Sequence, residues 1–211
     1  MYYFKRNPFL IRQLFKKSLL WSIPDSTHEV YLTFDDGPTP ELTLSILEIL
    51  DFYKAKATFF CVGENVKRYP ELFNSILDKG HGVGNHTFNH LNAWKNDNYF
   101  YLENIAKAAE YIPSRVFRPP YGRINSKLIK EIKKHYQIVM WTVLSGDFDR
   151  NTNPLQCFRN ATSKTKAGDI IVFHDNLKAM QNVIEALPKT LDFFLKKGIK
   201  VVALPNNKLQ F

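Results

Sequence analysis

Short apolar runs of strand character alternate with longer windows of helical periodicity over residues 27–205, and no other feature of the sequence limits the fold as strongly. Seven strand-like runs lie at 29–34, 57–62, 80–84, 115–118, 138–144, 169–173 and 198–204. The helical windows between them lie at 41–53, 64–79, 97–111, 125–135, 154–166 and 178–197. Strands separated by helices form parallel βα units with right-handed crossovers. We therefore expect an α/β protein with either an open doubly wound sheet or a closed barrel.

Polar side chains gather where the strand-like runs end. The pairs Asp35–Asp36 and Asn85–His86 and the single residues Arg118, Asp147 and His174 stand at five such ends. In a (β/α) barrel the carboxyl ends of all strands meet at one mouth, where barrel enzymes build their sites, whereas an open sheet spreads them along an edge. The convergence of five polar clusters therefore favours the barrel.

The composition is that of an ordinary globular protein with a basic surface. Of the 211 residues 45% are hydrophobic, and 29 basic against 20 acidic residues give a net charge of +9. Such an excess concentrates anions, so an acidic polymer or an anionic membrane surface is a candidate contact, and a merely solvated basic surface is the alternative. No nucleic-acid-binding motif is present. Nothing in the sequence indicates an oligomeric state.

Residues 1–26 form a basic amphipathic segment that we separate from one folded domain at residues 27–211. Residues 9–23 lack the uninterrupted apolar stretch and small-residue cleavage site of a signal peptide, which favours a cytoplasmic or membrane-surface location. Their apolar residues instead fit one helical face, with bases elsewhere. Such a helix lies in a membrane interface or docks on the domain, and docking is favoured. The apolar residues are Phe9, Leu10, Leu14, Phe15, Leu19 and Leu20.

His86 and His90 have an i, i+4 spacing, which would place both imidazoles on one side of a helical turn, where they can share a metal ion. Many helices carry such pairs without a metal, so the pair alone leaves open a metal site and a pair of surface or core histidines. A third ligand close to the pair would favour the metal site over the alternative.

Asp35 and Asp36 supply that candidate ligand, because they stand at a strand end and are followed by Gly37 and Pro38. The structural alternative is a helix cap or a turn in which an aspartate binds backbone amides. One aspartate that completes a His₂-carboxylate site, with the other free beside it, provides what metal-assisted hydrolysis needs: an open position for water and a nearby base.

Five ordered motifs resemble those of the polysaccharide deacetylase family, carbohydrate esterase family 4, with its NodB homology domain. They are Thr-Phe-Asp-Asp-Gly-Pro at 33–38, His-Thr-Phe-Asn-His at 86–90, Arg-Pro-Pro-Tyr at 118–121, Gly-Asp-Phe-Asp at 146–149 and Val-Phe-His at 172–174. The similarity spans about residues 28–205. It implies a deformed (β/α) barrel with about seven parallel strands.

The resemblance also implies roles for individual residues. It makes Asp36, His86 and His90 the ligands of one divalent metal ion, with zinc as the default and cobalt, nickel or manganese as alternatives. It makes Asp35 the general base toward the attacking water and His174 the acid that protonates the leaving amine. The backbone amide of Tyr121 would stabilise the oxyanion.

Further residues would support this chemistry. Arg118 would pair with and orient Asp35, and Asp147 would bond to His174 and favour its charged form, although each could be a purely structural partner. Pro120, Phe148 and Val172 would line the acetyl pocket; the last two depart from the Trp and Leu common in the family, which leaves acyl preference open. Trp141 could stack on a sugar face, but its place in a strand-like run favours the core.

The expected activity is hydrolysis of the N-acetyl group of an N-acetylhexosamine unit in a poly- or oligosaccharide. A hydrolase of a non-sugar amide or imide on the same scaffold and a non-catalytic glycan-binding module are the alternatives. Retention of Asp35 argues against the first, because such relatives tend to lose this base. The complete set of base, ligands and acid argues against the second. Peptidoglycan, chitin-type oligomers and lipid-linked saccharides all present the same acetamide, so the substrate stays open.

Overall fold

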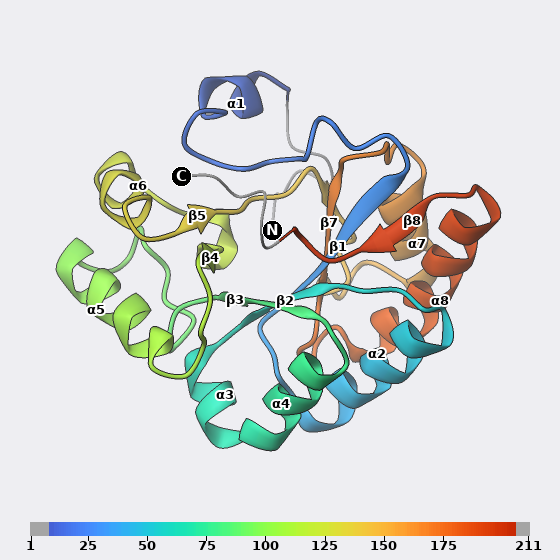
Figure 1. Ribbon diagram of the computed structural model, residues 1–211, viewed down its shortest axis with the longest axis horizontal. Coiled ribbons are helices and arrows are strands. Elements are labelled where there is room, and N and C mark those ends of the chain that lie inside the picture. The colour runs from blue at the N-terminus through green and yellow to red at the C-terminus, as the bar shows by residue number, and fades with distance from the viewer. Residues whose placement is uncertain (1–8, 206–211) are drawn as a thin grey trace.

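The computed structural model describes residues 9–205, in which eight short strands form the centre and helices lie around them (Figure 1). The strands are β1 Glu29–Asp35, β2 Thr58–Cys61, β3 Gly82–Asn85, β4 Val116–Phe117, β5 Gln137–Ile138, β6 Val143–Leu144, β7 Ile170–His174 and β8 Lys200–Val202. The helices are α1 Phe9–Leu14, α2 Pro40–Phe52, α3 Gly63–Arg68, α4 Pro70–Asp78, α5 Asn98–Ala109, α6 Ser126–Ile132, α7 Pro154–Thr162 and α8 Met180–Lys196.

The strands form one parallel sheet in the order β5-β4-β3-β2-β1-β7-β6, with β8 also paired to β1. Its two edge strands, β5 and β6, follow each other in the chain with only residues 139–142 between them. The five Cα–Cα steps from Ile138 to Val143 span at most about 18 Å, so the sheet must curl until its edges come close together. The predicted deformed barrel is thus confirmed.

The predicted strand 138–144 is wrong as a single element, because its two ends belong to opposite edges of the sheet. Val139 donates its N–H to Phe117 on the β4 side, whereas Thr142 donates to Ile170 of β7. Between them Met140 donates to Leu20. The apolar pattern of this segment arises because it crosses the closing seam of the barrel and is buried there, not because it is one continuous strand.

Residues 20–22 of the N-terminal segment help to fill that seam. Leu20 forms a parallel bridge with Val139, and Ser22 forms an antiparallel bridge with Asp169. Leu19 and Trp21 are buried on either side. The division of the chain at residue 26 stays a prediction.

The predicted single helical face of this segment is wrong. Helix α1 ends at Leu14, and Leu10 and Leu14 are exposed by 80% and 77%. Docking therefore holds for Leu19 and the extended residues after it, and not for these two helical leucines. Within residues 9–205 the helices lack the length and apolar character that crossing a bilayer requires.

The remaining helical windows correspond to observed helices, with one division. The window 64–79 is two helices, because Pro70 has no backbone N–H to continue α3 and instead occupies the first turn of α4. The main core lies between the sheet and the helices that cover it, and the rings of Phe34 and Phe59 stack at 5.0 Å within it. This core fixes the strands whose ends carry the polar residues.

The register of the strands brings those ends together. Asp35, the last residue of β1, is aligned with Phe60 of β2 and with His174 of β7. On the other side of β2, Asn85 is aligned with Cys61 and with Phe117. The residues that follow these positions therefore meet at one mouth of the barrel.

We expect Leu19→Ala to destabilise the protein by about 2–5 kcal/mol, because Leu19 is 5% exposed and its truncation leaves a cavity at the closing seam. Leu10→Ala, the same chemical change at a side chain that is 80% exposed, should change the unfolding free energy by about 0.5 kcal/mol or less. Urea unfolding measures both. Equal effects of the two substitutions would contradict the seam packing.

Candidate metal centre

Asp36, His86 and His90 come together at the mouth of the barrel as a candidate metal site. Asp36 Oδ1 lies 3.5 Å from His86 Nε2 and 3.0 Å from His90 Nε2. All three ligand atoms lie within 4.8 Å of one another. A tetrahedral ion about 2.1 Å from each ligand separates ligand atoms by roughly 3.4 Å, so these separations suit a zinc-sized ion.

The proton positions at His86 also fit a cation. Its Nδ1 lies 2.7 Å from the carbonyl oxygen of Arg118, which can only accept, so Nδ1 carries the proton. The other ring nitrogen, Nε2, faces the Asp36 carboxylate, so either a second proton or a metal ion must lie between them. Burial alone would raise the pKa of Asp36, but its hydrogen bonds with His86 and His90 hold it well below the ordinary value. The three donors therefore fit a divalent ion.

The predicted helical turn at residues 86–90 is wrong, although the two histidines do converge. The segment is a loop in which Thr87 and His90 have φ values of 64° and 55°. The side chain of Asn85 accepts a hydrogen bond from the Thr87 N–H at 2.9 Å, and Thr87 Oγ1 accepts one from Leu91 at 3.1 Å. These bonds, and not an α-helical repeat, place both imidazoles beside Asp36.

Strained backbone is concentrated at this site. Five non-glycine residues within 9–205 have a positive φ, and four of them are Asp36, Thr87, His90 and Tyr121. Left-handed conformations cost energy in such residues and persist where the surrounding structure determines them, most often at functional sites. The strain therefore supports a functional and not a packing role for these residues.

Asp35 lies beside the metal site and is held by Arg118. Its Oδ1 accepts a hydrogen bond from Arg118 Nη1 at 2.6 Å, and both side chains are buried. Arg118 Nη1 also donates to Thr33 Oγ1 at 2.7 Å. Burial lowers the pKa of Arg118, and the contact with Asp35 opposes this effect in part. The ordinary pKa of an arginine lies far above neutral. The guanidinium thus fixes one carboxylate oxygen and leaves the other available.

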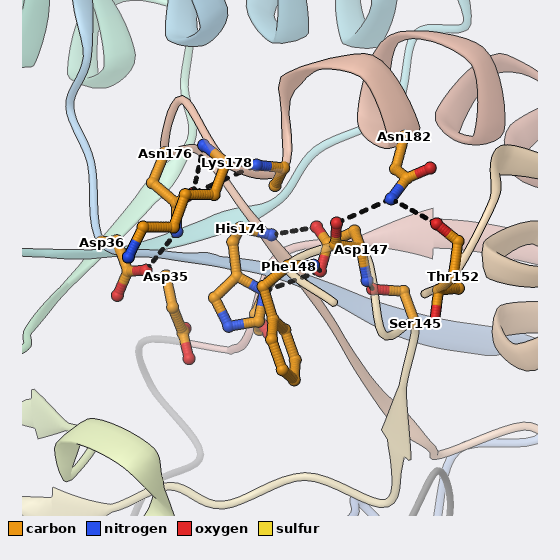
Figure 2. A network of polar contacts seen from close by, with 12 residues as sticks. Asp35, Asp36, Ser145, Asp147, Phe148, Thr152, His174, Asn176, Lys178 and Asn182 are labelled. Carbon is orange, nitrogen blue, oxygen red and sulfur yellow. Dashed lines mark hydrogen bonds and ion pairs between the residues drawn. The ribbon is translucent and has the colours of Figure 1, made fainter. Parts of the chain in front are cut away.

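His174 lies across the same mouth and is held by Asp147. Its Nδ1 is 2.8 Å from Asp147 Oδ1, and its backbone N–H donates to Asp147 Oδ2 at 2.6 Å (Figure 2). Burial lowers the pKa of His174, but the charge and hydrogen bond of Asp147, together with the charges of Asp36 and Asp35, outweigh burial and raise it to about 10. The imidazole is therefore protonated at neutral pH and can donate a proton from Nε2.

A cavity of about 670 Å³ joins these groups. Of the predicted pocket residues Phe148 and Val172 line it and Pro120 does not; Pro120 is buried next to Tyr121, which does line it. Trp141, for which the core was favoured, also lines the cavity. The complete lining is Asp35, Asp36, Thr39, Val62, Glu64, Asn65, His86, Asn89, His90, Tyr121, Trp141, Leu144, Phe148, Val172, His174, Asn176, Leu177 and Lys178.

Sequence reasoning missed the asparagines of this site. Asn176 donates to Asp36 Oδ2, and Asn182 donates to the backbone oxygens of Asp147 and Thr152 (Figure 2). Asn65 donates to the backbone oxygen of Asp36. No local pattern marks Asn65 or Asn182, because their partners are distant in sequence. The position of Asn176 two residues after His174 was the one available indication.

Residues 22–138 match the family model described as polysaccharide deacetylase. The chain is 34% identical over 191 residues to a peptidoglycan-N-acetylglucosamine deacetylase of Bacillus cereus, covering 87% of this chain and 90% of that protein. It is 32% identical to a chitooligosaccharide deacetylase of Azorhizobium caulinodans, covering 72% and 76% of the two chains.

Solved structures of similar proteins agree with the sequence comparison. The crystal structure of the Bc1960 peptidoglycan N-acetylglucosamine deacetylase in complex with 4-naphthalen-1-yl-N-oxidanyl-benzamide superimposes with a TM-score of 0.87 at 32% identity, covering 94% of this chain and 95% of that one. BA3943, a pseudoenzyme of carbohydrate esterase family 4 from Bacillus anthracis, superimposes with a TM-score of 0.76 at 26% identity, covering 88% and 67%. By fold, motifs and sequence identity, this chain belongs to the polysaccharide deacetylase family, carbohydrate esterase family 4.

Proposed function

We propose that this protein is a metal-dependent deacetylase that hydrolyses the N-acetyl group of N-acetylhexosamine units in a glycan. The main support for this proposal is that one cavity contains two carboxylates with different partners. Asp36 faces His86 and His90 as a ligand, whereas Asp35 is held apart from them by Arg118. Metal-assisted amide hydrolysis needs both.

The residues then have defined tasks. Asp36, His86 and His90 would hold a divalent ion, which when bound would supply Lewis-acid chemistry toward the acetamide carbonyl and toward water. Asp35 takes the proton from the attacking water, with its orientation fixed by Arg118. The backbone N–H of Tyr121 donates to the oxygen on which negative charge develops. His174 delivers the proton that the amine needs in order to leave.

We propose zinc as the metal. Two imidazole nitrogens and one carboxylate oxygen form a donor set that zinc favours at catalytic sites, with a further position open for water or substrate. The same donors accept cobalt, nickel or manganese, so the choice rests on donor chemistry and on the ligand separations above.

The substrate class follows from the relatives together with the cavity. Relatives of this chain are named for peptidoglycan and for chitooligosaccharides, and we propose a glycan with N-acetylglucosamine units as the substrate here. Phe148 packs edge-on against the His174 ring with a centroid separation of 4.9 Å, and Val172 also lines the cavity. We propose that these two side chains contact the acetyl methyl group.

The alternatives are weaker. The pseudoenzyme of Bacillus anthracis shows that family membership does not by itself establish catalysis. In this chain, however, the base, the three ligands and the acid all face one cavity. Cleavage of cyclic imides by this protein, without release of acetate from acetylated sugars, would overturn our assignment.

We expect Asp35→Asn to reduce acetate release from an acetylated chito-oligosaccharide by at least about 100-fold, because the amide cannot accept a proton from water. The Asn oxygen can still accept from Arg118, and the three ligands are unchanged, so zinc should stay bound. Acetate release and metal content measure the two effects. A variant with zinc bound and nearly full activity would refute Asp35 as the base.

We expect Asp147→Asn to move the alkaline limb of the pH–rate profile to lower pH. Asp147 contributes most to raising the pKa of His174 to about 10, with smaller contributions from Asp36 and Asp35, so the acid form is present below that pH and is lost above it. Without the Asp147 charge the acid form is lost at lower pH, and activity at pH 9 should fall at least about tenfold. Asp192→Asn, which removes a carboxylate paired with Lys196 at 2.7 Å on the surface, should leave the profile unchanged. An unshifted limb in Asp147→Asn would argue against His174 as the acid.

We also propose that α1 contacts an anionic membrane surface, which would place the enzyme at a membrane. Leu10 and Leu14 are exposed beside the exposed bases Lys16 and Lys17. Replacing both leucines with Asp should weaken binding to vesicles containing phosphatidylserine by at least about tenfold. Leu195→Asp, at a side chain that is 63% exposed on α8, should not. Co-sedimentation measures this, and equal binding of all three proteins would exclude the contact.

A further inference from the structure

Three consecutive residues at the C-terminal end of β7 lie against three different parts of the site. His174 is aligned with Asp35 in the sheet. Asp175 accepts the Gly37 N–H at 2.7 Å and the Thr43 hydroxyl at 2.8 Å. Asn176 donates from Nδ2 to Asp36 Oδ2 at 2.5 Å (Figure 2). The contact between Asn176 and a candidate metal ligand has no part in the acid and base chemistry above.

The orientation of the Asn176 amide is determined by its own loop. Its Oδ1 accepts the backbone N–H of Lys178 at 2.9 Å and that of Ala179 at 3.2 Å. Backbone N–H groups only donate, so the atom facing them must be the oxygen, and the NH₂ group must face Asp36. The amide is thereby fixed between the start of α8 and the carboxylate.

This contact gives the two carboxylate oxygens of Asp36 different partners. Oδ2 is occupied by the Asn176 donor, whereas Oδ1 faces the Nε2 atoms of His86 and His90. The carboxylate cannot rotate freely, and it presents a single oxygen to the ion. A ligand held by a hydrogen bond in this way loses less freedom when the metal binds, which raises affinity.

We propose that Asn176 is the positioning residue of the metal ligand Asp36, a role that rests on the proposed metal centre. It presets the carboxylate as a one-oxygen ligand and keeps the other oxygen from the ion. The backbone of Asp36 is held independently, because its N–H donates to Phe60 and its carbonyl accepts from Asn65. Asn176 therefore acts on the side chain alone.

Asn176→Ser separates this role from the hydrogen bonds that the Asn176 side chain accepts within its own loop. A serine hydroxyl can still accept backbone N–H groups two and three residues on, but its side chain is too short to reach Asp36 as well. Asn182→Ser is the matched control, because Asn182 donates the same kind of amide N–H to Asp147 and Thr152 and touches no ligand.

The test is zinc affinity of the full chain, measured by competition with a chromophoric chelator, together with thermal unfolding of the metal-free proteins. We expect Asn176→Ser to bind zinc about 10- to 100-fold more weakly than the wild type, and Asn182→Ser to bind it with unchanged affinity. The metal-free Asn176→Ser protein should melt close to the wild type.

Three results would overturn the proposal in distinguishable ways. Equal, tight zinc binding by the wild type and Asn176→Ser would remove the role of Asn176 and leave the metal centre intact. Failure of the wild type to bind zinc would overturn the metal centre and this role with it. A large loss of stability in metal-free Asn176→Ser, matching its loss of zinc, would assign Asn176 to the folding of the loop.

Discussion

The buried guanidinium of Arg118 is the group on which both the barrel and its site depend. It donates to Asp35 and Thr33 of β1 and to the backbone oxygens of Val139 and Met140 in the closing seam, and it lies 4.1 Å from the Phe60 ring of β2. A buried cation that loses its partner costs about 3–5 kcal/mol, so these bonds must form together. The closing seam and the orientation of the base are thus set by one charge.

The same residue reaches the metal centre through its backbone. The carbonyl of Arg118 accepts from His86 Nδ1, which fixes the tautomer of a ligand, while its side chain fixes the base. Metal ligand and base therefore share a support and cannot shift independently. This arrangement explains how two adjacent aspartates, chemically identical, acquire different tasks: Asp35 faces a guanidinium and Asp36 faces two imidazoles.

The sequence predicted the parts of the fold that local patterns encode and failed where tertiary contacts decide. The order of strands and helices and the polar strand ends follow from periodicity. The division of 138–144 does not, because its apolar residues are buried at a seam whose other side, Leu20, is more than 100 positions away. The loop at Thr87 and His90 was mistaken for a helical turn because their left-handed backbone depends on hydrogen bonds that a spacing rule does not contain.

The asparagines of the site escaped prediction for a related reason: an amide has no preferred partner until the fold supplies one. At the end of β7, however, strand pairing gives each of three consecutive residues its partner. Because β7 pairs with β1 in one register, His174, Asp175 and Asn176 reach the acid position, the turn at Gly37 and the ligand Asp36 in sequence order. A shift of that register by one residue would reverse the faces of β7 and displace all three contacts together. The precision of the metal site is therefore a property of strand pairing as much as of its ligands.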